Sequence, residues 1–186
     1  MRFMTLIAAV TLTPGLAFAD GFDYNYLEAG YVSSEIDAGG VDIDGNGLDI
    51  RGSWELQNNF QLVGSYTAQD YDGGVDVSVF QIGGGWHKPL SEKMDLITSL
   101  TWIATEVNNV DDNGLGIEIG LRGMAAPKVE LEAALQYADV GNADSAFRFD
   151  GRYHFTPNFA AGGGATFNDD GTTLRIGVRY TFGGGI

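Results

Sequence analysis

Residues 172–182 read TTLRIGVRYTF, and this stretch decides the fold. Successive side chains of an extended chain point to opposite faces, so one face of this stretch carries apolar residues: Leu174, Ile176, Val178, Tyr180 and Phe182. The other face carries threonine, arginine and glycine. Such an alternation predicts a β-strand between an apolar and a polar environment. Membrane barrels and soluble sandwiches both contain strands of this kind, so the rest of the chain has to distinguish them.

The alternation recurs in ten segments, which turn signals separate from one another. Most are about ten residues long, the length that a tilted strand needs to cross a bilayer. The sequence therefore predicts an all-β fold, a closed antiparallel up-and-down transmembrane β-barrel of ten strands. Eight strands are the alternative if the two weaker segments, 47–56 and 159–168, fail to pair. The ten segments are 24–33, 47–56, 60–70, 75–87, 94–107, 115–124, 129–139, 145–155, 159–168 and 172–182.

One face of each segment is apolar, and the opposite face carries charged residues. Lipid does not tolerate charges at the bilayer midplane, so the charged faces must line a lumen. Long side chains of opposite sign in a narrow bore predict a connected network, because an unpaired buried charge is costly. We expect Glu28 and Arg179 to pair at the seam between the first and last strands. The predicted lumen charge network consists of Glu28, Arg51, Glu118, Arg122, Glu132, Arg148, Asp150, Arg152, Arg175 and Arg179, with further inward acids at Asp49, Glu55, Asp95 and Glu130.

Small residues also face inward and predict one sector of the lumen with little to fill it. Barrels of about eight strands are filled by side chains, whereas those of about 16 to 18 enclose an aqueous channel. Ten strands lie nearer the filled end, so we expect water only in that sector. Its small residues are Gly83, Gly85, Ala160, Gly162 and Gly164.

Residues 1–19 have the features of a secretory signal peptide. They contain one basic residue, Arg2, then an apolar run, and they end in the small-x-small triplet Ala17-Phe18-Ala19. This pattern predicts cleavage before Asp20. The apolar run is shorter than the roughly 20 residues of a transmembrane helix. Residues 20–186 are predicted to form a single outer-membrane β-barrel domain, and the absence of cysteine excludes disulfides.

Charge predicts an orientation as well as a class. The formal net charge is −15 at pH 7, which argues against binding the phosphates of a nucleic acid. If both termini are periplasmic, Lys88, Lys93 and Lys128 fall in periplasmic turns. Acidic residues then fill the opposite connections, and outward aromatics sort to the two rims, as in membrane barrels. We therefore expect a bacterial outer-membrane location with acidic extracellular loops.

The pattern Arg175-x-Gly177-x-x-Tyr180-x-Phe182 resembles the C-terminal assembly signal of bacterial outer-membrane β-barrels. Together with the ten segments, it makes residues 20–186 similar to the small single-chain barrels, the class of the OmpA membrane domain and OmpX. The resemblance implies contact with outer-membrane lipid and lipopolysaccharide, recognition of residues 175–182 by the barrel assembly machinery, and a monomer. The chain departs from the class because residues 183–186 follow Phe182, where such barrels commonly stop.

Candidate chemistry is sparse. The two histidines, His87 and His154, come at the periplasmic ends of their segments, the wrong side for the known small-barrel enzymes, so we expect no catalytic residues and no organic cofactor. The run Asp42-x-Asp44-x-Asn46-Gly47 matches the first half of a calcium loop, but the twelfth position is Ser53 instead of glutamate. An ordinary turn is the simpler interpretation. A looser site for weakly bound Ca²⁺ or Mg²⁺ stays open on Asp42, Asp44, Asn46 and Asp49.

Two functions remain compatible with the sequence. One is a structural or surface-interaction outer-membrane barrel whose acidic extracellular loops meet cations, lipopolysaccharide or a partner. The other is a narrow porin-like channel for small solutes or ions.

Overall fold

The computed structural model describes residues 21–37, 40 and 42–182. The predicted signal peptide and the extension after Phe182 lie outside these residues. No helix in the described part is long and apolar enough to cross a membrane. The described chain forms ten strands: β1 (Tyr26–Asp37), β2 (Asp42–Glu55), β3 (Phe60–Tyr71), β4 (Val75–Ser91), β5 (Met94–Val107), β6 (Val110–Ala126), β7 (Val129–Val140), β8 (Asn142–Thr156), β9 (Phe159–Phe167) and β10 (Gly171–Thr181).

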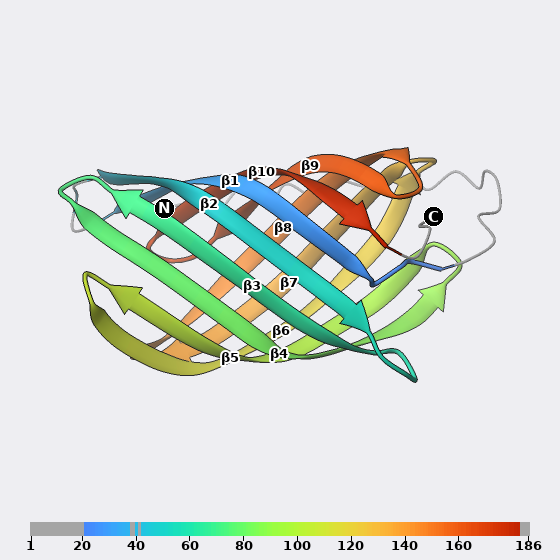
Figure 1. Cartoon of the computed structure of the whole chain (residues 1–186), viewed down its shortest axis with the longest axis horizontal. Helices are drawn as coiled ribbons and strands as arrows, with labels where there is room; N and C mark the ends of the chain where they lie inside the picture. The colour runs from blue at the N-terminus through green and yellow to red at the C-terminus, as the bar shows by residue number, and fades with distance from the viewer. Residues whose placement is uncertain (1–20, 38–39, 41, 183–186) are drawn as a thin grey trace, which may run out of the picture.

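Each strand pairs antiparallel with its neighbours in sequence, and β1 pairs with β10 to close the barrel (Figure 1). The ten-strand prediction is therefore confirmed. The eight-strand alternative is wrong, because β2 pairs with both β1 and β3 and β9 pairs with both β8 and β10. At the seam Glu28 lies opposite Arg179. We call the end where β1 begins and β10 ends the terminal end, and the opposite end the acidic end.

The strands reach further at the acidic end than the sequence predicts. β2 begins at Asp42 and β6 at Val110, whereas the predicted segments begin at 47 and 115. The strands therefore include most of the acids that the sequence placed in or beside loops, and these acids lie at the strand ends next to the turns. Residues Asn108 and Asn109 form one such turn, with φ of 48° and 65°. Two consecutive positive φ values give the turn whose twist matches that of the strands, and asparagine tolerates them.

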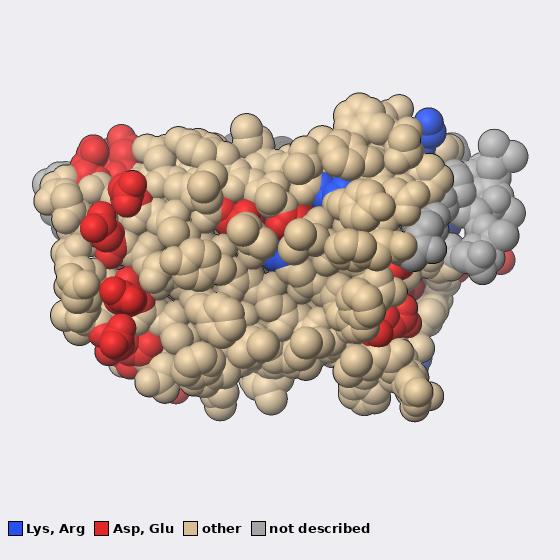
Figure 2. All heavy atoms as spheres, in the orientation of Figure 1, with Lys and Arg blue, Asp and Glu red and all other residues tan. Residues whose placement is uncertain are grey.

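The outward face of the barrel is apolar around its middle. Ile176, for example, is 67% exposed although it lies in the centre of β10. In water this much exposed apolar surface would be unfavourable, but it suits the hydrocarbon core of a bilayer. Aromatic side chains pack at both borders of this band, with Trp54 6.4 Å from Phe182 and Phe80 6.3 Å from Trp102 between ring centroids. Figure 2 shows that most of the surface between the two ends is uncharged.

Candidate functional site: the lumen and its two ends

The lumen holds a network of buried ion pairs that reaches across the bore. Glu28 on β1 accepts from Arg179 Nε at 2.7 Å and from Arg152 Nε at 3.1 Å, and it also pairs with Arg175. These arginines come from β10 and β8, so one carboxylate joins the first strand to the end of the chain. The pair predicted at the seam, Glu28 with Arg179, is present.

Glu130 on β7 is the most buried member of the network, with no exposed surface. Its carboxylate oxygens lie 3.0 Å from Arg122, 3.1 Å from Arg152 and 3.2 Å from Arg179. His154 Nε2 lies 3.1 Å from the same carboxylate. The alternation placed Glu130 on the inward face, but only the structure shows that it connects three arginines from three strands.

The remaining predicted members join this network. Arg148 pairs with Glu132 at 2.6 Å, with Glu118 at 3.0 Å and with Asp150. Arg51 pairs with Asp49 at 3.1 Å, and Arg175 also binds Asp49. All ten predicted network residues are thus linked through carboxylate and guanidinium groups. Paired charges of this kind are tolerated in a small bore, because every charged group of the network has at least one partner of opposite sign.

The predicted empty sector is wrong at β9. Ala160, Gly162 and Gly164 do face inward, but the side chains of Arg152 and Asp150 occupy the space in front of the two glycines. A Cβ atom at Gly162 would meet Arg152 and the Gly151 carbonyl, and one at Gly164 would meet Asp150. The inward glycines of β9 are therefore the places where charged side chains from β8 lie close to the wall.

A cavity of about 250 Å³ lies instead in front of β3, β4 and β5. On the side of β3, β4 and β5, the wall of the cavity includes the uncharged polar side chains of Gln61, Ser65, Gln81 and Ser99. The arginines of the charge network form the opposite wall. The lumen is therefore divided lengthwise into a filled half and a polar, hollow half.

At the terminal end, residues 21–25 reach into the mouth of the lumen. The sequence placed Tyr24 in the first strand, but β1 begins at Tyr26, and Tyr24 contacts the far wall instead. Its hydroxyl donates to Asp95 Oδ2 at 2.8 Å, and its ring stacks on His87 with 3.8 Å between centroids. Burial raises the pKa of the Tyr24 hydroxyl far above its usual range, against the opposing effect of Arg122, so it stays a donor.

Arg122 on β6 holds the same segment from a second direction. Its guanidinium carbon lies 4.8 Å from the ring centroid of Phe22 and 4.8 Å from that of Tyr24, distances typical of cation–π contacts. Its Nη1 donates to the Asp23 carbonyl oxygen at 3.1 Å. Tyr24 is consequently only 2% exposed. We call residues 21–25 the N-terminal plug.

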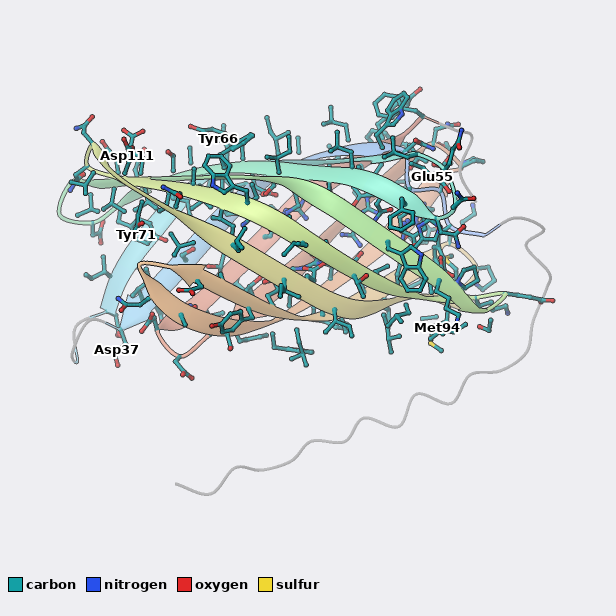
Figure 3. All side chains as sticks on the ribbon, turned by 90° about the horizontal axis from the view of Figure 1, so that it is seen from below. Asp37, Glu55, Tyr66, Tyr71, Met94 and Asp111 are labelled. Carbon is teal, nitrogen blue, oxygen red and sulfur yellow. The ribbon has the colours of Figure 1, made fainter. Side chains whose placement is uncertain are left out.

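The acidic end carries a ring of outward-facing carboxylates beyond the aromatic border. Three hairpins place acids directly opposite each other across the strand pair: Glu35 with Asp44, Asp70 with Asp76, and Glu106 with Asp111. Asp139 on β7 continues the ring. All seven are exposed, and we call them the acidic collar. Figure 2 shows the acids gathered at this end, and Figure 3 shows Asp37 and Asp111 there, opposite Glu55 and Met94.

The four residues predicted to share a cation do not come together. Asp42, Asp44 and Asn46 lie on the exposed face of β2, whereas Asp49 faces the lumen and is 2% exposed. Asp49 is engaged by Arg51 and Arg175, and Asn46 accepts a hydrogen bond from the Tyr31 hydroxyl. No cluster of three acidic or histidine residues able to hold a metal occurs in the part of the chain that the structure describes. Residues 42–49 match the spacing of a calcium loop but form part of strand β2, so their side chains point to both faces of the sheet and do not surround one cation.

The basic residues complete the electrostatic pattern. Lys93 and Lys128 lie in or beside the turns at the terminal end, and Lys88 lies near that end of β4. Every arginine that the structure describes points into the lumen. Among the described residues, the acidic collar therefore has no lysine or arginine beside it, and like charges directly opposite each other destabilise a strand pair.

Comparisons with known proteins bear on the fold. No protein-family model matches the sequence, and no curated protein matches it. Among solved structures, the beta domain of the Bordetella autotransporter BrkA is 11% identical, with a TM-score of 0.55 over 85% of this chain and 99% of that one. An outer membrane channel from Pseudomonas putida F1 is 13% identical, with a TM-score of 0.54 over 92% of this chain and 100% of that one.

A third similar structure is Neisserial surface protein A, at 16% identity and a TM-score of 0.47 over 88% of this chain and 100% of that one. At these identities the likeness concerns the fold alone. The closed antiparallel barrel of this chain is consistent with that likeness. The chain has the fold of the small bacterial outer-membrane β-barrel proteins.

Proposed function

We propose that the chain is a non-enzymatic, monomeric outer-membrane barrel that is closed at rest and presents the acidic collar on the cell surface. The observation that carries this proposal is the ion-pair network, because Glu28 and Glu130 hold guanidinium groups from β6, β8 and β10 inside the bore and narrow it to one half. A general porin needs an open lumen, and ion pairs across the bore oppose one.

Both ends of the lumen support a closed resting state. The N-terminal plug fills the terminal end through Tyr24 and Arg122. Towards the acidic end, Gln69 Nε2 donates to Ser34 Oγ at 2.8 Å, and Ser34 Oγ lies 2.8 Å from Thr173 Oγ1. The buried side chains of Val32 and Ile103 narrow the same region.

The acidic collar suggests what the surface does. Its opposed carboxylates repel each other, and cations from solution relieve this repulsion. Lipopolysaccharide is itself anionic, so divalent cations held weakly at the collar would bridge the protein to the outer leaflet. This requires the collar to be extracellular and both termini periplasmic, which agrees with the lysines at the opposite end.

Planar-bilayer recording of purified, refolded protein tests the closed state. We expect no conductance, or small and infrequent openings. Steady single-channel steps of the size given by a general porin would refute it.

The orientation of the barrel in the membrane can be tested with single-cysteine variants, because the chain has no cysteine of its own. A Gly73→Cys variant in the β3–β4 turn should react with a membrane-impermeant thiol reagent on intact cells. A matched Asn58→Cys variant in the β2–β3 turn should react only after the outer membrane is opened. The reverse pattern would place the collar in the periplasm.

A further inference from the structure

The hollow half of the lumen contains polar groups that lack a protein partner. Gln61 is 7% exposed, yet its Oε1 makes no hydrogen bond, and neither does the buried Nε of Arg122. Ser65, Gln81 and Ser99 make no side-chain hydrogen bond to any other residue that the structure describes. Buried polar atoms are nearly always satisfied, and a polar cavity of about 250 Å³ has room for several water molecules. The cavity is therefore hydrated and suited to small polar solutes.

The N-terminal plug lies directly on this cavity. Tyr24 and Tyr26 both line it, as do Gln61 and Arg122. Tyr24 is anchored on β4 and β5, the strands that form the hollow wall, through His87 and Asp95. The plug thus closes the terminal end over the half of the lumen that is open, and not over the half that the ion pairs already fill.

The plug is held differently from the rest of the barrel. It precedes the first residue of the β1 ladder, Tyr26, and its contacts to the far wall are side-chain contacts together with one bond from Arg122 to the Asp23 carbonyl. Asn25 marks the junction, because its Oδ1 accepts from the backbone N–H of Glu55 at 2.9 Å. Residues 21–24 can therefore leave the mouth without breaking any strand pairing.

From the cavity, its unsatisfied polar wall and the separable plug, we propose that residues 21–24 of the plug are a gate hinged at Asn25. In place, they seal the cavity in front of β3–β5 from the solution at the terminal end; displaced, they admit small water-soluble molecules, ions included. The network limits the size of what enters, because the arginine wall leaves only the hollow half free. This gated chamber goes beyond the closed resting barrel proposed above.

A single cysteine in the cavity wall tests the gate, since the full-length chain contains no other. Ser99→Cys changes one atom and places a thiol on the hollow wall of β5. The reaction rate with a small cationic methanethiosulfonate reagent is measured on refolded protein in detergent, with Tyr24 intact and with Tyr24→Ala. We expect at least a tenfold faster reaction when Tyr24 is removed, and an intermediate rate for Tyr24→Phe, which keeps the stacking on His87 but loses the bond to Asp95.

Tyr66→Ala is the matched control, because it removes a tyrosine from the outward face of β3; it should leave the rate at Ser99→Cys unchanged. Circular dichroism and thermal unfolding verify that each variant is folded. Should Tyr24→Ala fail to fold, Asp95→Asn weakens the same anchor while leaving both rings in place, and it should also raise the rate. Equal rates with and without Tyr24, whether fast or slow, would overturn the gate.

Discussion

Replacing Glu130 by glutamine should be among the most destabilising single changes in the barrel. The substitution keeps the shape of the side chain but removes the negative charge that three arginines share. Arg152 and Arg179 retain Glu28 at 3.1 and 2.7 Å, whereas Glu130 is the only carboxylate that pairs with Arg122 among the described residues. The loss therefore falls mainly on Arg122, which is only 4% exposed.

The expected magnitude follows from that asymmetry. Removing one partner of a buried pair costs about 3 to 5 kcal/mol, because a charge is left uncompensated. The hydrated cavity beside Arg122 lets water solvate it in part, so we expect the lower end of this range for Glu130→Gln. Removing both charges, in Glu130→Gln with Arg122→Met, should recover part of the loss.

Urea unfolding of refolded protein, followed by tryptophan fluorescence, measures the free energies of unfolding. Glu92→Gln in the exposed β4–β5 turn is the control and should change stability by less than about 0.5 kcal/mol. A loss below about 1 kcal/mol for Glu130→Gln would contradict this reasoning. So would a double variant no more stable than Glu130→Gln alone, since the cost would then not come from an unpaired Arg122.

Three further results are expected. Glu28→Ala and Arg179→Ala should each lower the urea midpoint, and their double-mutant cycle should show a coupling of about 0.5 to 3 kcal/mol; additive effects would mean that the pair has no energetic role. The Asp70→Asn variant, which removes the negative charge opposite Asp76, should stabilise the barrel by about 0.2 to 1 kcal/mol. Ca²⁺ at about 10⁻⁴ to 10⁻³ M should raise the melting temperature of the wild type more than that of this variant. If calorimetry at millimolar Ca²⁺ gave no binding heat and no shift in melting temperature, the collar would not bind the cation. Asn108→Ala should cost about 1 kcal/mol because its φ of 48° is unfavourable for alanine, whereas Asn108→Gly should be nearly neutral, which thermal unfolding distinguishes.

The alternation of period two was sufficient to predict the strands, their inward faces and the seam pair, because side-chain direction follows from residue parity alone. The strand ends were missed for the same reason. Beyond Leu48 the outward row of β2 continues through Asn46 and Asp44, which are polar, so no apolar face marks the strand. Parity also argues against the four-residue cation set, since Asp49 must face away from Asp42 and Asp44 once they share a strand.

Other features depend on the length and direction of particular side chains. A glycine at position 162 suggests that another part of the chain lies close to it, but the sequence does not identify Arg152 as the residue that fills this space. Tyr24 and Tyr26 alternate as strand residues would, and only the position of Asp95 across the bore shows that Tyr24 leaves the strand. The contact between Tyr24 and Asp95 on β5 is set by closure of the barrel and has no local signal.

The position of Glu28 has a consequence for the order of folding. Its three arginines, Arg152, Arg175 and Arg179, are all supplied by the last two-fifths of the chain, and the bond from Arg179 joins residues 151 positions apart. An incomplete barrel that lacks both β8 and β10 would hold a bare carboxylate on its first strand, and one that lacks either strand would lose part of its pairing. We therefore expect closure of the barrel to be a late and slow step in folding, because it relies on contacts between residues far apart in the chain.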